Sequence, residues 1–352
     1  MQYRDNRVLY DGSAFSRLWE KSAIGILTEG PALLLSDSEV IFCRDHRGVE
    51  FDGLVDQEAF SLWLSGRLSK NSKTLLEAAV LEALRVPGNK VVLSDNFERL
   101  SLGESESWAM RWSSDNHPSK GSPDSEILWF ESKEQLYDIE RGEAGLLADL
   151  LNWTVRVDER GRIPEVLVID DEQSVVTYRL SEEDPIGEMP QLTDEIISEI
   201  TSMDSETLDN NGIFVPGVSN WPIESVGIPL QGGRLLDSVE AEIIQSDSEL
   251  SISASILNDL WMRGLNTRSG FKYGTTWRCY PGQVGDSHAP WLVVDPTSEA
   301  PDNWSEACLS SRLASGVNKK WLFPINDNGE WRYLQISRPP SDSRWSNPKR
   351  HE

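Results

Sequence analysis

The order of helix and hairpin signals repeats along this chain, and that repetition constrains the possible fold more than any other feature of the sequence. Each half contains an apolar helical pattern with a Glu-Ala pair, a second helix that ends near a glycine, and two apolar strands around a polar turn. These signals pair 48–64 with 232–245, 74–88 with 252–264, and 165–180 with 320–336. Their common order predicts a tandem duplication of a unit of about 150 residues.

The second unit alternates helical and strand patterns, which predicts a mixed α/β (α+β) fold. The expected elements are a helix over 252–263, strands over 275–280 and 291–294, a helix over 303–316 and a hairpin over 320–337. Asp302 is the expected N-cap of the later helix and Gly316 its end. In the first unit, the polar stretch 102–125 is expected to be a loop-like insertion.

Acidic residues are concentrated in the first 250 positions. The chain has 352 residues, with 58 Asp and Glu against 33 Lys and Arg and a net charge of −25. Residues 251–352 hold 12 basic and 10 acidic residues, so the remainder carries the whole excess. The acidic part is a poor partner for nucleic acid, whereas the last hundred residues could face a polyanion. The excess of carboxylates has a simpler explanation too, because a charged surface aids solubility.

One segment stands out within the acidic part. Residues 181–230 contain 11 Asp and Glu, no Lys or Arg, and several Pro, Gly, Ser and Asn. This composition predicts a connector, in which Ile196, Ile197 and Ile200 would give one short helix.

The sequence predicts a soluble, cytoplasmic protein without a metal site. It has no apolar run of about 18 residues for a membrane span, and its N-terminus lacks the apolar core of a secretory signal. The three cysteines are too widely spaced for a disulfide framework or a zinc ribbon. The four histidines are also too far apart for metal-ligand spacing. Of these, His288 draws attention because it follows a short polar loop and precedes an apolar strand.

Several short, separated motifs (boxes) in the second unit are similar to motifs of one known family. They are Arg263-Gly264 at a helix end, GFKYG at 270–274, Arg278-x-Tyr280, His288 before an apolar strand, and GVNKK at 316–320. In order and spacing, these boxes resemble the catalytic domain of archaeal tRNA-splicing endonucleases. Agreement of several boxes is more specific than any single one.

The resemblance implies a catalytic triad of Tyr280, His288 and Lys319. It also implies metal-independent cleavage of RNA, which leaves a 2′,3′-cyclic phosphate and a 5′-hydroxyl and needs no cofactor. The side chains suit this chemistry. A tyrosine phenolate can accept the proton of the attacking 2′-OH, an imidazolium can protonate the leaving oxygen, and an ammonium can stabilise the phosphorane.

Members of this family hold an extruded bulge base between two arginines of the opposite subunit. The resemblance places the first at Arg312, and Arg332 is the expected second, with Arg338 as the other candidate. Lys272 in the GFKYG box and Lys320 are further residues expected to bind RNA. Stacking of a guanidinium tolerates any base, which suits recognition of a bulge by its shape.

The first unit departs from the catalytic pattern. Ser125 or Glu126 falls where His288 is expected, and 158–168 contains no lysine. The resemblance therefore implies an inactive copy in a homodimer of two-repeat chains, where an acidic loop of the inactive unit docks on the active unit. The expected loop is Asp170, Asp171 and Glu172, although a solvated acidic turn would look the same.

These inferences give a domain plan in which each repeat pairs a small N-terminal α/β subdomain with a mixed-sheet, restriction-endonuclease-like subdomain. The predicted parts are 1–72 (N-terminal subdomain, first repeat), 73–182 (degenerate, inactive catalytic-like subdomain), 183–250 (acidic connector and N-terminal subdomain, second repeat), 251–340 (catalytic subdomain) and 341–352 (tail).

The favoured prediction is a tRNA-intron endonuclease, a metal-independent lyase that cuts precursor tRNA at bulge-helix-bulge sites, with no DNA or membrane partner. Two alternatives remain. Asp124 with Glu131-Ser132-Lys133 resembles the PD-(D/E)xK string of Mg²⁺-dependent nucleases, although its spacing is short. The chain could also be a non-catalytic subunit, but such a subunit has no reason to retain Tyr280, His288 and Lys319 together.

Overall fold

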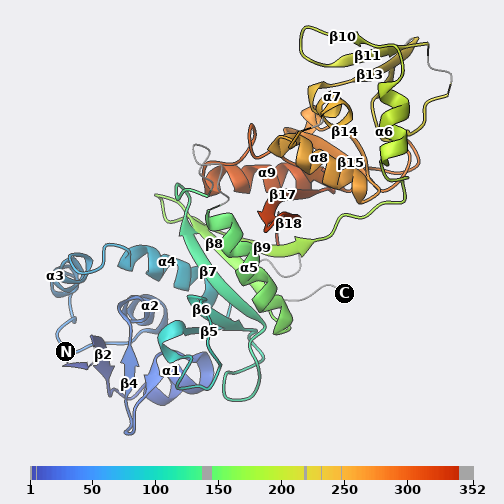
Figure 1. Cartoon of the computed structure of the whole chain (residues 1–352). Helices are drawn as coiled ribbons and strands as arrows, with labels where there is room; N and C mark the ends of the chain where they lie inside the picture. The colour runs from blue at the N-terminus through green and yellow to red at the C-terminus, as the bar shows by residue number, and fades with distance from the viewer. Residues whose placement is uncertain are drawn as a thin grey trace. The chain divides into compact units, whose positions relative to one another are not determined.

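The computed structural model describes residues 2–4, 6–136, 145–217, 220–230, 232–246 and 248–340 (Figure 1). The chain divides into two compact units. Unit 1 comprises Met1–Glu134, Asn152–Leu180 and Arg338–Glu352, and unit 2 comprises Gln135–Leu151 and Ser181–Ser337. The predicted tail at 341–352 lies outside the described residues.

Unit 1 begins with a small antiparallel sheet and four helices. In spatial order the strands are β1 (Gln2–Arg4), β2 (Arg7–Tyr10), β4 (Leu33–Leu35) and β3 (Ile26–Leu27). The helices are α1 (Phe15–Ser22), α2 (Asp37–Arg47), α3 (Gln57–Leu68) and α4 (Thr74–Arg85). Helices α2 and α4 pack together because each has an apolar face, on which Val40 and Leu81 are fully buried.

The second sheet of unit 1 is mixed. Its strands, in spatial and chain order, are β5 (Lys90–Leu93), β6 (Ala109–Trp112), β7 (Ser125–Glu131), β8 (Ile163–Ile169) and β9 (Val175–Glu183). Neighbours are antiparallel except β7 and β8, which are parallel. A parallel pair needs a long crossover, and here the crossover contains α5 (Leu146–Glu159).

Unit 2 also begins with a small antiparallel sheet. Its strands, in spatial order, are β10 (Glu206–Thr207), β11 (Ile213–Pro216), β13 (Gly233–Leu236) and β12 (Ile228–Leu230), with helices α6 (Asp194–Thr201) and α7 (Ser238–Gln245). The short helix predicted near 196–200 is present as α6. The acidic segment 181–230 is nevertheless more than a connector, because it supplies three strands, and Ile213 and Val215 of β11 enter the core.

The second sheet of unit 2 carries the boxes found in the sequence. Its strands, in spatial and chain order, are β14 (Asn266–Ser269), β15 (Trp277–Tyr280), β16 (Trp291–Val293), β17 (Lys320–Asp327) and β18 (Glu330–Ser337). The pair β16 and β17 is parallel and the others are antiparallel. Helix α8 (Ile252–Met262) precedes the sheet, a 3₁₀ turn (Phe271–Tyr273) joins β14 to β15, and α9 (Trp304–Gly316) crosses from β16 to β17.

Two local predictions were wrong. The N-cap of α9 is Asn303, whose side-chain oxygen accepts from the Glu306 amide at 3.2 Å, whereas the Asp302 amide donates to the Glu306 carboxylate. The stretch 102–125 is not a loop throughout, because it contains the fully buried strand β6. Between its polar flanks lies the run WAMRW, whose last four residues form β6 between β5 and β7.

The two units share strand order and strand direction in both of their sheets. They also share a buried glycine–carboxylate contact. Glu39 accepts from the amide of Gly25 at 2.8 Å, and Glu240 accepts from the amide of Gly227 at 3.0 Å. Each glutamate also closes a capping box at the start of its helix, α2 or α7. This likeness agrees with the predicted duplication, which stays a prediction; by strand order, α7 matches α2 rather than the segment 48–64.

The helices are all short in the described part of the chain. The longest there, α5, has 14 residues, whereas a bilayer span needs about 20. Within those residues, no helix has both the length and the apolar character to cross a membrane.

We expect Glu240 to make the stability of unit 2 depend on pH. Burial, together with the charge of Asp237, raises the pKa of this carboxyl from its ordinary 4.5 to about 7. The folded state holds the proton of Glu240 more tightly than the unfolded chain does. Protonation of Glu240 therefore stabilises the fold fully below about pH 4.5, and this stabilisation is lost as the pH rises through about 7. Its size is on the order of 3 kcal/mol, at 1.36 kcal/mol per pKa unit.

Urea unfolding of wild type and Glu240→Gln between pH 5.5 and 8 measures this contribution. The gap in free energy of unfolding between the two proteins should change with pH, because glutamine does not titrate. Glu39→Gln is the matched control in unit 1. Its carboxylate lies 3.6 Å from the buried guanidinium of Arg85, so its loss should destabilise at every pH tested. Parallel curves for wild type and Glu240→Gln would contradict the assignment.

Candidate active site

The sheet of unit 2 brings the three predicted triad residues to one edge. β15 runs antiparallel to β16, with Cys279 opposite Trp291, and β16 runs parallel to β17, with Trp291 opposite Lys320. The end of β15 therefore lies beside the beginnings of β16 and β17. Tyr280 is the last residue of β15, His288 comes three residues before β16, and Lys319 comes immediately before β17.

Lys319 is held where the chain turns from helix α9 into strand β17. Its amide donates to the carbonyl of Ala314 at 3.0 Å, and the preceding Asn318 has a left-handed φ of 55°. The Lys319 ammonium donates to the carbonyl of Ala289 and lies 5.2 Å from the centre of the Tyr273 ring. Burial, and then the positive charge of Arg278, lowers the pKa of Lys319 below its ordinary value.

His288 lies in the exposed loop between β15 and β16. Its side chain is exposed, and no hydrogen bond from the imidazole to another described residue is present. The next residue, Ala289, is buried and supplies the carbonyl that binds the Lys319 ammonium. That hydrogen bond fixes the backbone beside His288 next to Lys319, while the imidazole itself stays accessible to a ligand.

Tyr280 and Arg278 occupy the face of the sheet opposite the main core of unit 2. Trp277 and Cys279 belong to the core cluster that includes residues of α7 and α8. Because side chains alternate along a strand, Arg278 and Tyr280 face the other way. The Arg278 guanidinium lies 5.7 Å from the centre of the Tyr280 ring, and Tyr280 is only 7% exposed.

Arg278 and Tyr273 are site residues that the sequence prediction did not select. The Nε of Arg278 is buried without a hydrogen-bond partner in the described structure, and its charge acts on Lys319. Two cations close enough to act on each other make a favourable place for an anion such as a phosphate. The available signal was the two-residue spacing of Arg278 and Tyr280, which puts both on one face of a strand.

The predicted RNA-binding residues differ in their surroundings. Arg312 on α9 and Lys272 in the 3₁₀ turn are exposed, and Lys272 adjoins Phe271, which is 87% exposed. Arg332, in contrast, bonds the carboxylates of Glu182 at 2.6 Å and Asp327 at 2.9 Å.

The two remaining basic positions are distinguished by their neighbours as well. The Lys320 ammonium bonds both carboxylate oxygens of Glu183 at 2.8 Å. Arg338, the other candidate for the second arginine that holds the bulge base, is exposed. The acidic segment thus neutralises part of the basic surface within its own unit.

The predicted docking loop is the turn between β8 and β9. Asp170 shapes this turn, since its side chain accepts from the amides of Glu172 and Ser174 at 3.0 and 2.8 Å. Asp171 is ion-paired with Lys133, but its side chain remains 72% exposed. The turn therefore presents carboxylates to solvent.

Unit 1 has different side chains at the corresponding strand edge. Ser125 begins β7 and pairs with Arg111 and Ile163, as Trp291 begins β16 and pairs with Cys279 and Lys320. This register puts Trp112 at the place of Tyr280 and Arg162 at the place of Lys319. Trp112 is buried in an apolar cluster, and Arg162 bonds the buried carboxylate of Glu126 at 2.7 Å.

The same register corrects the earlier comparison of the two halves. Ser125 occupies the place of Trp291, so neither Ser125 nor Glu126 occupies the place of His288. Neither the Ser125 hydroxyl nor the Glu126 carboxyl can therefore take the role of the acid predicted for His288.

The residues of the alternative, magnesium-dependent nuclease do not converge. Asp124 immediately precedes β7 and Glu131 ends it, which separates them by about 23 Å at roughly 3.3 Å per residue. Asp124 accepts from the amide of Ser113, and Glu131 pairs with Lys73. The two carboxylates therefore cannot share one ion.

Comparison with known proteins places this site in a known type of domain. Residues 251–333 match the family model described as tRNA intron endonuclease, catalytic C-terminal domain. This range contains the strand edge with Tyr280, His288 and Lys319, and the match confirms the resemblance found in the sequence.

Three archaeal proteins named tRNA-splicing endonuclease are similar to a larger part of the chain. The Thermoplasma volcanium protein is 27% identical over 199 residues, which cover 53% of this chain and 67% of that protein. The Sulfurisphaera tokodaii protein is 28% identical over 155 residues, 43% of this chain and 81% of that protein. The Natronomonas pharaonis protein is 24% identical over 213 residues, 53% of this chain and 62% of that protein.

Proposed function

We propose that this chain is a tRNA-splicing endonuclease that cleaves precursor tRNA at bulge-helix-bulge sites. The observation that carries the proposal is the convergence of the end of β15 and the starts of β16 and β17, at residues within the matched catalytic domain. The similar archaeal proteins support the tRNA substrate, and the site supports the type of reaction.

The proposed reaction is an in-line transesterification on RNA. The 2′-oxygen attacks the adjacent phosphorus as its proton passes to Tyr280 in its phenolate form, and the bond from phosphorus to the 5′-oxygen breaks. His288, protonated, gives its proton to that 5′-oxygen, which leaves as a 5′-hydroxyl. Lys319, with Arg278 nearby, stabilises the charge of the phosphorane, and the other product is a 2′,3′-cyclic phosphate. Base, acid and electrostatic stabilisation all come from side chains, so no step needs a metal.

A labelled bulge-helix-bulge RNA incubated with the purified chain in EDTA tests this proposal. We expect cuts at both bulges, with cyclic-phosphate and 5′-hydroxyl ends. Cleavage that requires Mg²⁺ would overturn the mechanism, and binding without cleavage under either condition would indicate a subunit that needs a catalytic partner.

We further propose a homodimer in which unit 1 is inactive. At the sheet edge of unit 1, Trp112 and the ion-paired Arg162 leave neither a phenol nor a free cation for the reaction. Asp170, Asp171 and Glu172 would dock on the partner chain, as the exposure of Asp171 allows. Two active units related by a dimer axis suit a substrate with two bulges. This architecture assumes the tandem duplication and the domain plan inferred from the sequence.

Arg312 and Arg332 are proposed to clamp the bulge base of the RNA on the partner chain. Arg332 can do so while it keeps its ion pairs, because carboxylates bond the edge of a guanidinium and a base stacks on its face. We expect Arg312→Ala to lower cleavage at subsaturating RNA by roughly 5- to 150-fold, the equivalent of about 1–3 kcal/mol of stacking. Arg312→Lys should recover little, because it restores only the charge.

Mixing two impaired variants at subsaturating RNA tests whether the clamp acts between chains. A dimer of one His288→Ala chain and one Arg312→Ala chain would contain one complete site, with His288 from one chain and Arg312 from the other. Partial recovery of cleavage on mixing supports the homodimer and the clamp together. No recovery, with mixed dimers confirmed by differently tagged chains, would contradict action between chains.

A further inference from the structure

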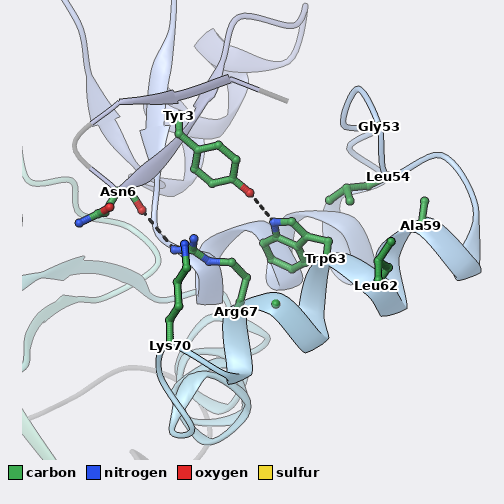
Figure 2. A pocket seen from close by; sticks show the side chains of 10 residues that line it. Tyr3, Asn6, Gly53, Leu54, Ala59, Leu62, Trp63, Arg67 and Lys70 are labelled. Carbon is green, nitrogen blue, oxygen red and sulfur yellow. Dashed lines mark hydrogen bonds between the residues drawn. The ribbon is translucent and has the colours of Figure 1, made fainter.

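Unit 1 contains a pocket that the proposed reaction does not use. It has a volume of about 630 Å³ and lies between the hairpin of β1 and β2 and helix α3 (Figure 2). The residues that give it its chemistry are Tyr3, Trp63, Gly66, Arg67 and Lys70.

The pocket has an ordered aromatic wall. The indole N–H of Trp63 donates to the Tyr3 hydroxyl at 2.7 Å, so each ring fixes the other (Figure 2). The Arg67 guanidinium lies 5.4 Å from the centre of the Tyr3 ring. Arg67 is itself held by Asp37 at 2.6 Å and by the carbonyl of Asn6 at 3.4 Å. Tyr3 remains 46% exposed, which leaves aromatic surface for a ligand.

The charge of the pocket is opposite to that of the chain around it. Residues 1–250 contain 48 acidic and 21 basic residues, yet the pocket lining includes Arg67 and Lys70 and no carboxylate. Arg67 is ion-paired with Asp37, so Lys70 supplies the net positive charge of the pocket. Lys70 is exposed and has no ion pair within the described residues. A positive pocket on an acidic surface favours a ligand that carries a local negative charge.

Gly66 keeps the pocket open. It lies inside helix α3, where glycine is a poor helix former. A Cβ at this position would meet nothing within 4 Å, so packing does not require glycine. Gly66 lines the pocket, and any larger side chain there would project into its volume.

We propose that this pocket binds an unpaired nucleotide of an RNA, with the base against Tyr3 and Trp63 and the phosphate at Lys70 and Arg67. Aromatic stacking combined with adjacent cations is the usual chemistry of single-strand recognition. The inference rests on the proposed function only for the source of the nucleotide, which would be a single-stranded part of the RNA substrate.

NMR titrations of the full chain test the pocket. The ligands are AMP, adenosine, inorganic phosphate and a short single-stranded oligoadenylate. Wild type should bind AMP with a Kd on the order of 1 mM, more tightly than adenosine or phosphate, and should bind the oligonucleotide more tightly still. Gly66→Leu should weaken AMP binding at least about tenfold by filling the pocket without removing any contact. Ser65→Leu is the matched control on the same helix, because Ser65 does not line the pocket and should leave binding unchanged.

Each other outcome overturns the proposal. Equal AMP binding by wild type and Gly66→Leu would place the nucleotide elsewhere. AMP binding without oligonucleotide binding would assign the pocket to a free nucleotide. A changed oligomeric state of Gly66→Leu, with no nucleotide binding by wild type, would assign it to a protein contact. The assay is independent of cleavage, so failure of the proposed endonuclease activity would be seen separately.

Discussion

Replacing His288 with alanine should lower the single-turnover rate of RNA cleavage by about 10²- to 10⁴-fold, the usual contribution of a general acid. Without the imidazole, the 5′-oxygen must leave as an alkoxide or take its proton from water. The fold should be unaffected, because the exposed His288 side chain has no hydrogen bond to another described residue. Thermal unfolding of the variant should therefore match that of wild type.

A modified substrate can separate acid catalysis from other roles of His288. In an RNA with sulfur in place of the 5′-bridging oxygen, the leaving thiolate needs no protonation, since a thiol is far more acidic than an alcohol. His288→Ala should cleave this RNA nearly as fast as wild type does. His46→Ala is a matched control in unit 1 and should cleave both substrates normally. A variant that is equally slow on both RNAs would show that His288 is not the acid.

Replacing Lys319 with alanine should lower the rate by about 10²- to 10³-fold, as the loss of one fixed charge-stabilising donor does in other enzymes. Part of this loss concerns geometry, because the ammonium also binds the carbonyl of Ala289 beside the His288 loop. Lys320→Ala is the matched control. It removes a neighbouring lysine whose ammonium is bonded to Glu183, and it should cost much less.

The pH profile of Lys319→Arg distinguishes the charge of Lys319 from a structural role. Burial and the charge of Arg278 lower the pKa of Lys319, so the ammonium is lost at a lower pH than in an exposed lysine. On the RNA with a 5′-bridging sulfur, which needs no proton from His288, cleavage that needs the cation should therefore decline as the pH rises through that pKa. In Lys319→Arg the decline should move to higher pH, because a guanidinium stays protonated. An alkaline decline at the same pH in both proteins would assign it to another group.

Much of the fold of unit 2 could be predicted from local sequence patterns. The helix over 252–263, the strand beginning at Trp291 and the final hairpin each follow from an apolar period bounded by turn residues, and these elements are present as α8, β16 and the pair β17 and β18. The helix that ends at Gly316 was likewise correct, although its N-cap was placed one residue early. Sequence alone hardly distinguishes Asp302 from Asn303 as the N-cap, because the two are adjacent, both are common N-cap residues, and both interact with Glu306.

The elements that were missed depend on burial between distant segments. Strand β6 is only four residues long and stands in a polar stretch, but it is fully buried between β5 and β7. The strands of the acidic segment were missed for a similar reason. Its carboxylates lie outside, while Ile213 and Val215 enter a core supplied by α7 and α8.

The sequence by itself determined which residue types are available for catalysis: one tyrosine, one histidine and one lysine in boxes with a recognisable order. Only the tertiary structure decided which of their neighbours share the site. Arg278 and Tyr273 act on it because strand β15 and the 3₁₀ turn bring them close to Lys319. The structure also decided that Arg332 and Lys320 are bonded to carboxylates of the acidic segment, about 140 to 150 positions away in the chain. The physical reason is that charge pairing and pocket formation depend on distance in space, which local patterns of 2 or about 3.6 residues do not encode.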